Sequence, residues 1–252
     1  MSRLASPRKW SKEAAVDDRP SPIDPASHRR ITEALTGLGE EETDRRLCAV
    51  CALLLGVSGA AIAVVSDSGH RGVLCSSNQA AASLEDLQVT LGEGPGIDAH
   101  KLGNPVTDAD LASAGPSRWL AFCAPAVDAG AAAVFAFPLR LGGIRLGTLT
   151  FHHAHAGRLT DDQYTEALFM VGIVTRSVLA IQAKARPGTV AGALQALVDD
   201  GAELHQAAGM VAVRLGVGVG EALVRLRALA FAHERPVADV AHDVVTGKQD
   251  LT

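Results

Sequence analysis

The pattern of hydrophobic positions predicts that helices and short strands alternate through the first two thirds of the chain. Between residues 31 and 55, apolar side chains recur every three or four positions, as on one face of a helix that Gly56 ends. Short apolar runs bounded by turn residues predict strands instead. These strands are expected at 60–65, 72–76, 106–110, 131–139 and 144–152, with hairpin turns at 66–69 and 140–143.

Helix-start signals place further helices between and after these strands. Pro95 is suited to the first turn of a helix, because its φ angle is already helical. Thr160 and Gln163 have the spacing of a capping box, in which each side chain bonds the backbone of the other residue. Helices are therefore expected over 78–87, from Pro95 onward, over 117–126 and over 161–185.

From residue 190 onward the pattern becomes entirely helical. Apolar and small residues alternate at spacings of three and four, which predicts a long helix that ends at Gly216. A second helix is expected over 219–232 and a third from Pro236. The positions expected to face a core are Leu194, Leu197, Gly201, Leu204, Ala208, Val211, Leu215, Val219, Ala222, Leu223, Leu226, Ala230, Phe231, Val237, Val240, Ala241 and Val244.

Two segments without an apolar period divide the chain. Residues 1–27 are rich in proline, serine and charge, which is typical of a disordered arm. Within 184–189, Pro187 and Gly188 interrupt the helical pattern and indicate a short hinge. We therefore expect an arm at 1–27, a mixed domain at 28–186 and a helical domain at 187–252.

Composition narrows the class of protein. The chain is 48% hydrophobic and 20% charged, as is ordinary for a soluble protein. Its longest apolar runs are shorter than the roughly 20 residues that span a bilayer, and the N-terminus lacks the apolar segment of a signal peptide. We expect a cytoplasmic protein with no membrane association. The net charge of −5 does not by itself indicate a nucleic-acid partner.

Neither the cysteines nor the glycines form a recognisable chemical motif. Cys48 and Cys51 have CxxC spacing, but they lie within an apolar helical pattern that has no second pair. We therefore expect Cys48 and Cys51 to be buried free thiols. The glycines of 92–96 match neither a phosphate loop nor a dinucleotide-binding loop, and a tight turn is expected there.

Three histidines near the end of an expected strand are candidate metal ligands. His153 and His155 share one face of the expected strand next to His152, but no acidic or thiol partner is placed beside them. A polar strand edge is the preferred interpretation. Because the chain also lacks GxSxG and HExxH motifs, we expect no catalytic residues, no metal, no cofactor and no enzyme activity.

The segment 205–245 carries a family resemblance. Its motifs are Ala207-Ala208-Gly209-Met210, Glu221-Ala222, Leu226-Arg227 and Val240-Ala241. With these motifs the segment resembles the ANTAR domain, the RNA-binding output module of bacterial antitermination regulators. The resemblance implies an all-α three-helix domain that binds RNA hairpins.

Residues 30–185 resemble a GAF domain. The resemblance rests on LGEGPGIDA at 91–99, PVTDADL at 105–111, RW at 118–119 and AFPLRLGGIRLGTLTFHH at 136–153. It implies an α+β fold, an antiparallel sheet flanked by helices, with a pocket in which many such domains sense a small molecule. The pairing with the C-terminal motifs is similar to actinobacterial GAF–ANTAR regulators. A ligand for this domain is possible, but its identity is unknown.

The candidate RNA-binding residues are polar and basic positions of the helical domain. A guanidinium group is planar, permanently charged and able to bind phosphate through two hydrogen bonds. Each arginine could instead belong to a solvated helix surface, as in a Glu221–Arg225 pair. The candidates are His205, Gln206, Gly209, Arg214, Arg225, Arg227 and Arg235.

Two features of the helical domain oppose RNA binding. From 187 to 252 five basic residues face eight acidic ones, and Ala208 occupies a position that is commonly lysine in ANTAR domains. Our first hypothesis is a homodimeric regulator that binds hairpins in nascent transcripts, promotes antitermination and is controlled by the GAF-like domain. The alternatives are a dimerising protein-interaction module that has lost RNA binding and, less favoured, a helix-turn-helix DNA-binding protein.

Overall fold

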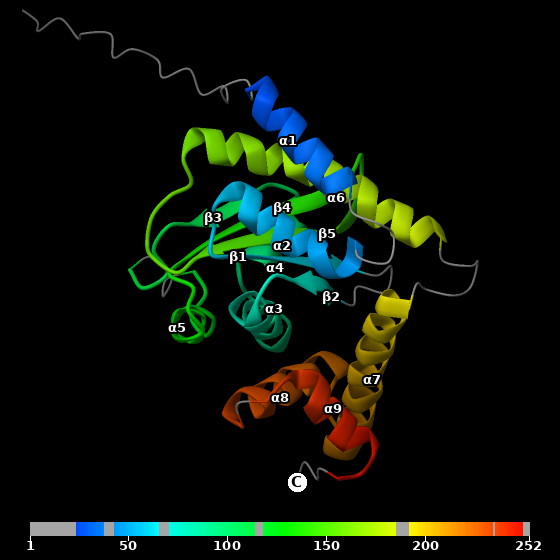
Figure 1. Ribbon diagram of the computed structural model, residues 1–252. Coiled ribbons are helices and arrows are strands. Elements are labelled where there is room, and N and C mark those ends of the chain that lie inside the picture. The colour runs from blue at the N-terminus through cyan, green and yellow to red at the C-terminus, as the bar shows by residue number, and fades with distance from the viewer. Residues whose placement is uncertain are drawn as a thin grey trace, which may run out of the picture.

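A mixed domain and a bundle of three helices make up the part of the chain that the structure describes (Figure 1). The computed structural model describes residues 24–37, 43–65, 71–113, 118–184, 192–233 and 235–248, with the backbone alone at 43–45, 182–184 and 192–202. The predicted turn at 66–69, most of the arm and most of the hinge lie outside these residues. The expected fold class, an antiparallel sheet domain followed by helices, is confirmed.

The mixed domain, here called the sheet domain, is built on one 5-stranded antiparallel sheet in the order β2-β1-β5-β4-β3. Side chains of the central strands are buried almost without interruption. Helices cover both faces of the sheet, which is why these strands appear as continuous apolar runs in the sequence. The strands are β1 (Gly59–Val65), β2 (Arg71–Ser76), β3 (Val106–Asp108), β4 (Ala133–Leu141) and β5 (Ile144–His153).

Each face of the sheet has its own hydrophobic core. One face packs on α1 (Pro25–Thr36), α2 (Thr43–Leu55) and α6 (Asp161–Lys184). The other packs on α3 (Gln79–Leu91), α4 (Pro95–Leu102) and α5 (Cys123–Asp128), as Figure 1 shows. By length and composition alone, 161–181 of α6 could cross a membrane, but its apolar side packs against the sheet through residues such as Met170 and Val174.

Several helix boundaries differ from the sequence prediction. The single helix expected over 31–55 is two helices, and α1 begins at Pro25, inside the expected arm, where Asp24 accepts a hydrogen bond from the backbone N–H of Ser27. α3 continues to Leu91 rather than to residue 87. α5 begins later than expected, because the Glu93 carboxylate accepts hydrogen bonds from the backbone N–H groups of residues 121 and 122 at 2.7 and 3.0 Å.

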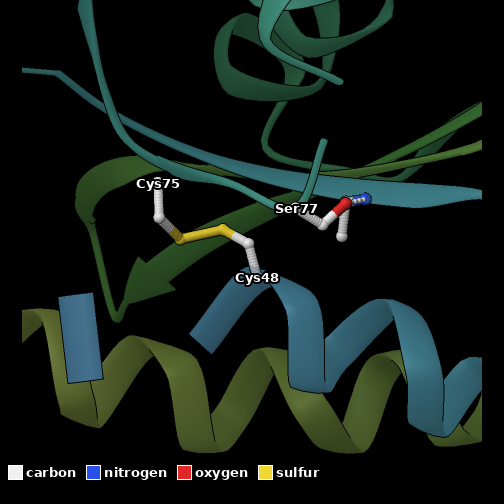
Figure 2. Close-up of a disulfide and its surroundings, with 4 residues drawn as sticks. Cys48, Cys75 and Ser77 are labelled. Atoms are coloured by element: carbon white, nitrogen blue, oxygen red, sulfur yellow. Dashed lines mark hydrogen bonds between the residues drawn. A yellow bond between two sulfur atoms is a disulfide. The ribbon is translucent and has the colours of Figure 1, made fainter. Parts of the chain in front are cut away.

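A disulfide joins Cys48 on α2 to Cys75 on β2, with 6.0 Å between their Cα atoms (Figure 2). The prediction of a free thiol was therefore wrong for Cys48. Cys51 and Cys123 are free and buried, as expected for Cys51, and burial raises the pKa of the Cys51 thiol to about 12. A protonated, buried thiol is chemically inert, so the CxxC spacing carries no redox motif.

Reduction of the disulfide is expected to lower the free energy of unfolding of the sheet domain by about 3 kcal/mol. The bond closes a loop between residues 27 positions apart, and its loss restores conformational freedom to the unfolded chain. Urea titrations with and without reductant, followed by fluorescence of the buried Trp119 in a Trp10→Phe background, measure the difference. The Cys48→Ala/Cys75→Ala variant is the control, and its unfolding midpoint should not change when reductant is added. Equal midpoints for the oxidised and reduced proteins would contradict the prediction.

The C-terminal bundle consists of α7 (Gly192–Leu215), α8 (Val219–Ala232) and α9 (Val237–Val245). Gly216 ends α7 in the left-handed conformation, with a φ of 65°, as the sequence predicted. Most of the expected core positions of 204–244 are buried or partly buried, but Val219 and Phe231 are exposed. Ala230, the residue before Phe231, is fully buried in the core of the bundle. The expected core positions Leu194, Leu197 and Gly201 lie in the part of α7 for which only the backbone is described.

Candidate nucleic-acid interface

The predicted site residues come from all parts of the C-terminal bundle. α7 supplies His205, Gln206, Gly209 and Arg214; α8 supplies Arg225 and Arg227; and Arg235 lies just before α9. All except Gly209 and Arg227 are exposed. A Cβ atom added to Gly209 would meet nothing within 4 Å, so the helix surface there is open to a close approach.

Two of the exposed arginines are held by carboxylates. Nη2 of Arg225 lies 2.6 Å from Oε1 of Glu221, the i,i+4 pair weighed as the alternative to RNA contact. Nη2 of Arg235 lies 2.7 Å from Oδ2 of Asp243, and this hydrogen bond holds the pKa of Asp243 below its ordinary value. Exposed pairs of this kind contribute little to stability. Either guanidinium can therefore exchange its carboxylate for a phosphate at small cost.

Arg227 has a different environment. Its Nε atom is buried without a hydrogen-bond partner, and no hydrogen bond or ion pair joins its guanidinium to another described residue. Burial lowers the pKa of this side chain. The guanidinium lies against the end of α3, where a Cβ atom added to Gly92 would be 2.9 Å from Nη1 of Arg227. The residue thus faces the sheet domain rather than open solvent.

A pocket of about 410 Å³ lies between the sheet domain and the bundle. On the sheet-domain side β2, α3 and the start of α4 line it, and on the bundle side α7, α8 and the start of α9. Val89 of α3 also packs against the hydrophobic core of the bundle. Of the predicted site residues, His205 and Arg227 line this pocket. The structure therefore divides the candidates between an exposed group and a group that faces the sheet domain.

Inside the sheet domain, buried polar side chains gather between the sheet and α3 and α4. Arg71 donates to Oε2 of Glu85 at 2.8 Å and to the Thr148 hydroxyl at 2.6 Å. On β5, the strand that carries Thr148, the Thr150 hydroxyl and both ring nitrogens of His152 are buried without a partner. Burial, together with the neighbouring histidine, lowers the pKa of His152 to about 4, so its ring is neutral at pH 7.

The histidines at the end of β5 show no metal-binding arrangement. The rings of His153 and His155 are stacked with their centroids 4.8 Å apart. Among the residues that the structure describes, no three or more His, Cys, Asp or Glu side chains are grouped as a metal ion would require.

Comparison with known protein families decides the nature of the C-terminal bundle. Residues 192–245 match the family model of the ANTAR domain. All the candidate RNA-binding residues lie within this match. The prediction of an ANTAR domain, made from four short motifs, is confirmed. A search of curated proteins finds no match for the chain.

The sheet domain is similar to GAF domains of solved structure. The GAF domain of an Acinetobacter phosphoenolpyruvate-protein phosphotransferase has a TM-score of 0.49 and 11% identity, over 64% of this chain and 95% of that one. The GAF domain of the corresponding Coxiella burnetii protein has a TM-score of 0.44 and 16% identity, over 62% and 94%. The free methionine-R-sulfoxide reductase of Neisseria meningitidis has a TM-score of 0.45 and 14% identity, over 64% and 95%.

The structure changes the interpretation of two residues of the ANTAR domain. Phe231, its only aromatic residue, is 47% exposed at the end of α8 instead of buried. Ala208 is fully buried in the core of the domain. A lysine at that position would have to displace its neighbours, so the alanine does not remove a charge from the exposed surface of this chain. Helical periodicity locates Ala208 correctly, but nothing in the sequence signals the exposure of Phe231.

Proposed function

We propose that this protein is a transcription regulator whose ANTAR domain binds RNA hairpins in nascent transcripts and promotes antitermination. The observation that carries the proposal is the ANTAR match at 192–245, with all the candidate residues inside it. The sheet domain acts as the sensor that controls this output. The regulator is cytoplasmic, where nascent transcripts are, and has no catalytic activity.

The chemistry of the exposed surface supports contact with RNA loops. RNA-binding domains recognise unpaired loop bases by stacking and by hydrogen bonds, and the backbone by charge. Phe231 offers a ring on which a base can stack, and Arg214 and Arg225 lie exposed on α7 and α8. Since the net charge of the chain is −5, these contacts have to be local rather than the effect of a basic field.

The proposal includes a homodimer and a sensed small molecule. Met210 and Val213 lie three residues apart on α7 and are 38% and 86% exposed, so together they offer an apolar strip to a helix of a second copy. Two ANTAR domains in a dimer would bind two hairpins with higher avidity than one. The unpartnered polar atoms of Thr150 and His152 offer hydrogen bonds to a small molecule within the sheet domain.

Arg225→Ala is expected to weaken hairpin binding by at least roughly tenfold, because it removes a bidentate arginine contact from the exposed surface. The measurement is binding of the full-length protein to a hairpin RNA library and to duplex DNA across a salt series. The matched control is Arg176→Ala, which removes an exposed arginine of α6 in the sheet domain. RNA affinity no higher than duplex affinity, or equal effects of the two substitutions, would refute RNA recognition by this face.

The exposed apolar surface also favours a second candidate, a dimerising protein-interaction module. In that case the same preparation would self-associate in ultracentrifugation but bind no hairpin. A Val213→Asp substitution would then abolish self-association. The combination of hairpin binding and self-association supports the first proposal alone.

A further inference from the structure

Among the described residues the guanidinium of Arg227 has no partner, which distinguishes the pocket between the two domains from an ordinary packing defect. Buried or half-buried charges in proteins are normally paired, because an unpaired one loses hydration without compensation. The other arginine of the pocket, Arg71, is already bound to Glu85 and Thr148. Arg227 has no such partner among the described residues.

The remaining lining of the pocket suits a small molecule that is partly apolar. Asp86 is its one lining carboxylate, and burial, with Glu85 and Asp239 nearby, raises the pKa of Asp86. Hydrophobic side chains form a large part of the wall; they include Val89, Ile97, Leu204, Leu223, Pro236 and Val237. At about 410 Å³ the pocket lies within the range of small-molecule sites.

We propose that the pocket between the sheet domain and the ANTAR domain binds a small organic anion, whose phosphate or carboxylate group pairs with Arg227. The planar guanidinium can donate two parallel hydrogen bonds to either group. The apolar part of the ligand lies against Val89 and Leu223. Arg71 borders both this pocket and the polar interior of the sheet domain, but the wall of the pocket also requires residues of the ANTAR domain.

Such a ligand would regulate the output domain directly. It bridges the two domains and occupies Arg227, one of the candidate RNA-binding arginines, so anion and RNA compete for this residue. By linkage, RNA binding weakens anion binding by the same factor. This regulatory consequence rests on the proposed RNA-binding function, whereas the anion site itself does not.

The test uses full-length protein, isothermal calorimetry and pairs of probes that differ only in charge. The pairs are AMP with adenosine, for the phosphate arm, and benzoate with benzamide, for the carboxylate arm. At least one anion should bind roughly tenfold more tightly than its neutral counterpart, and Arg227→Gln should remove that preference. Arg225→Gln is the matched control, because Arg225 is exposed on the same helix and does not line the pocket.

Several outcomes would overturn the site. They are an absence of binding by both anions, equal binding of charged and neutral probes, or equal effects of the Arg225 and Arg227 substitutions. For the regulatory step, the anion that binds should weaken hairpin binding about tenfold more than sodium chloride of the same ionic strength. If no hairpin binds at all, the proposed function fails while the calorimetric result still decides the anion site. Hairpin binding that the anion leaves unchanged would overturn the competition.

Discussion

Glu85→Gln is expected to lower the free energy of unfolding of the sheet domain by about 3–5 kcal/mol. The side chains of Arg71 and Glu85 are only 7% and 0% exposed, and their nitrogen and oxygen atoms are 2.8 Å apart. Glutamine has nearly the same shape but no charge, so it leaves a buried guanidinium without its counter-ion. It also disturbs Gln88, which donates to Glu85 and accepts from the backbone N–H of Gly96.

The matched control is Glu221→Gln, which makes the same chemical change in an exposed pair. Loss of the Glu221–Arg225 pair should cost no more than about 0.5 kcal/mol. Urea unfolding followed by Trp119 fluorescence reports the sheet domain, and circular dichroism at 222 nm reports both domains. Similar costs for the two substitutions would contradict the prediction that burial makes the Arg71–Glu85 pair important for stability.

Val89→Asp is expected to separate the ANTAR domain from the sheet domain and to strengthen hairpin binding. Val89 packs against the hydrophobic core of the ANTAR domain, although it belongs to α3 of the sheet domain. An aspartate there would place a carboxylate in an apolar contact, at a cost of about 1.4–3 kcal/mol. That cost shifts the equilibrium toward separated domains by roughly ten- to a hundredfold. Arg227 then becomes available to RNA.

Small-angle scattering should show a larger radius of gyration for this variant, and the hairpin titration should show a lower Kd. The Leu120→Asp variant is the control, because Leu120 is 82% exposed in the sheet domain and does not line the pocket. The double variant Val89→Asp/Arg227→Ala should lose the gain in affinity. An unchanged radius, or a gain that survives the loss of Arg227, would contradict masking of this residue by α3.

The parts of the structure that local chemistry controls could be predicted from the sequence. Thr160 and Gln163 do exchange the hydrogen bonds of a capping box at 3.0 and 3.2 Å, and α6 begins after them. Gly216 ends α7 at the expected residue. In α9, helical periodicity identified the buried residues Val237 and Val240. In each case neighbours in sequence determine the outcome.

Features that depend on distant segments could not be predicted. The pairing of Cys48 with Cys75 requires the packing of α2 on β2, whereas the sequence offered Cys51 as the nearer partner. Periodicity placed Arg227 correctly outside the ANTAR core, but it contains no information on the α3 helix that covers that side. The candidate site was thus predicted as a set of residues, but not as two groups in different surroundings.

The conformation of Gly92 limits which mutations this protein can accept. Its φ of 69° ends α3 in the left-handed region, where a side chain costs conformational energy. A side chain at this position would also press against the guanidinium of Arg227. In a saturation library, substitutions at position 92 should therefore be disfavoured for two reasons, the positive φ angle and the steric contact with Arg227. In the Arg227→Ala background the steric penalty disappears and the conformational one remains, so asparagine, which adopts positive φ more readily than other residues, should become the best-tolerated replacement.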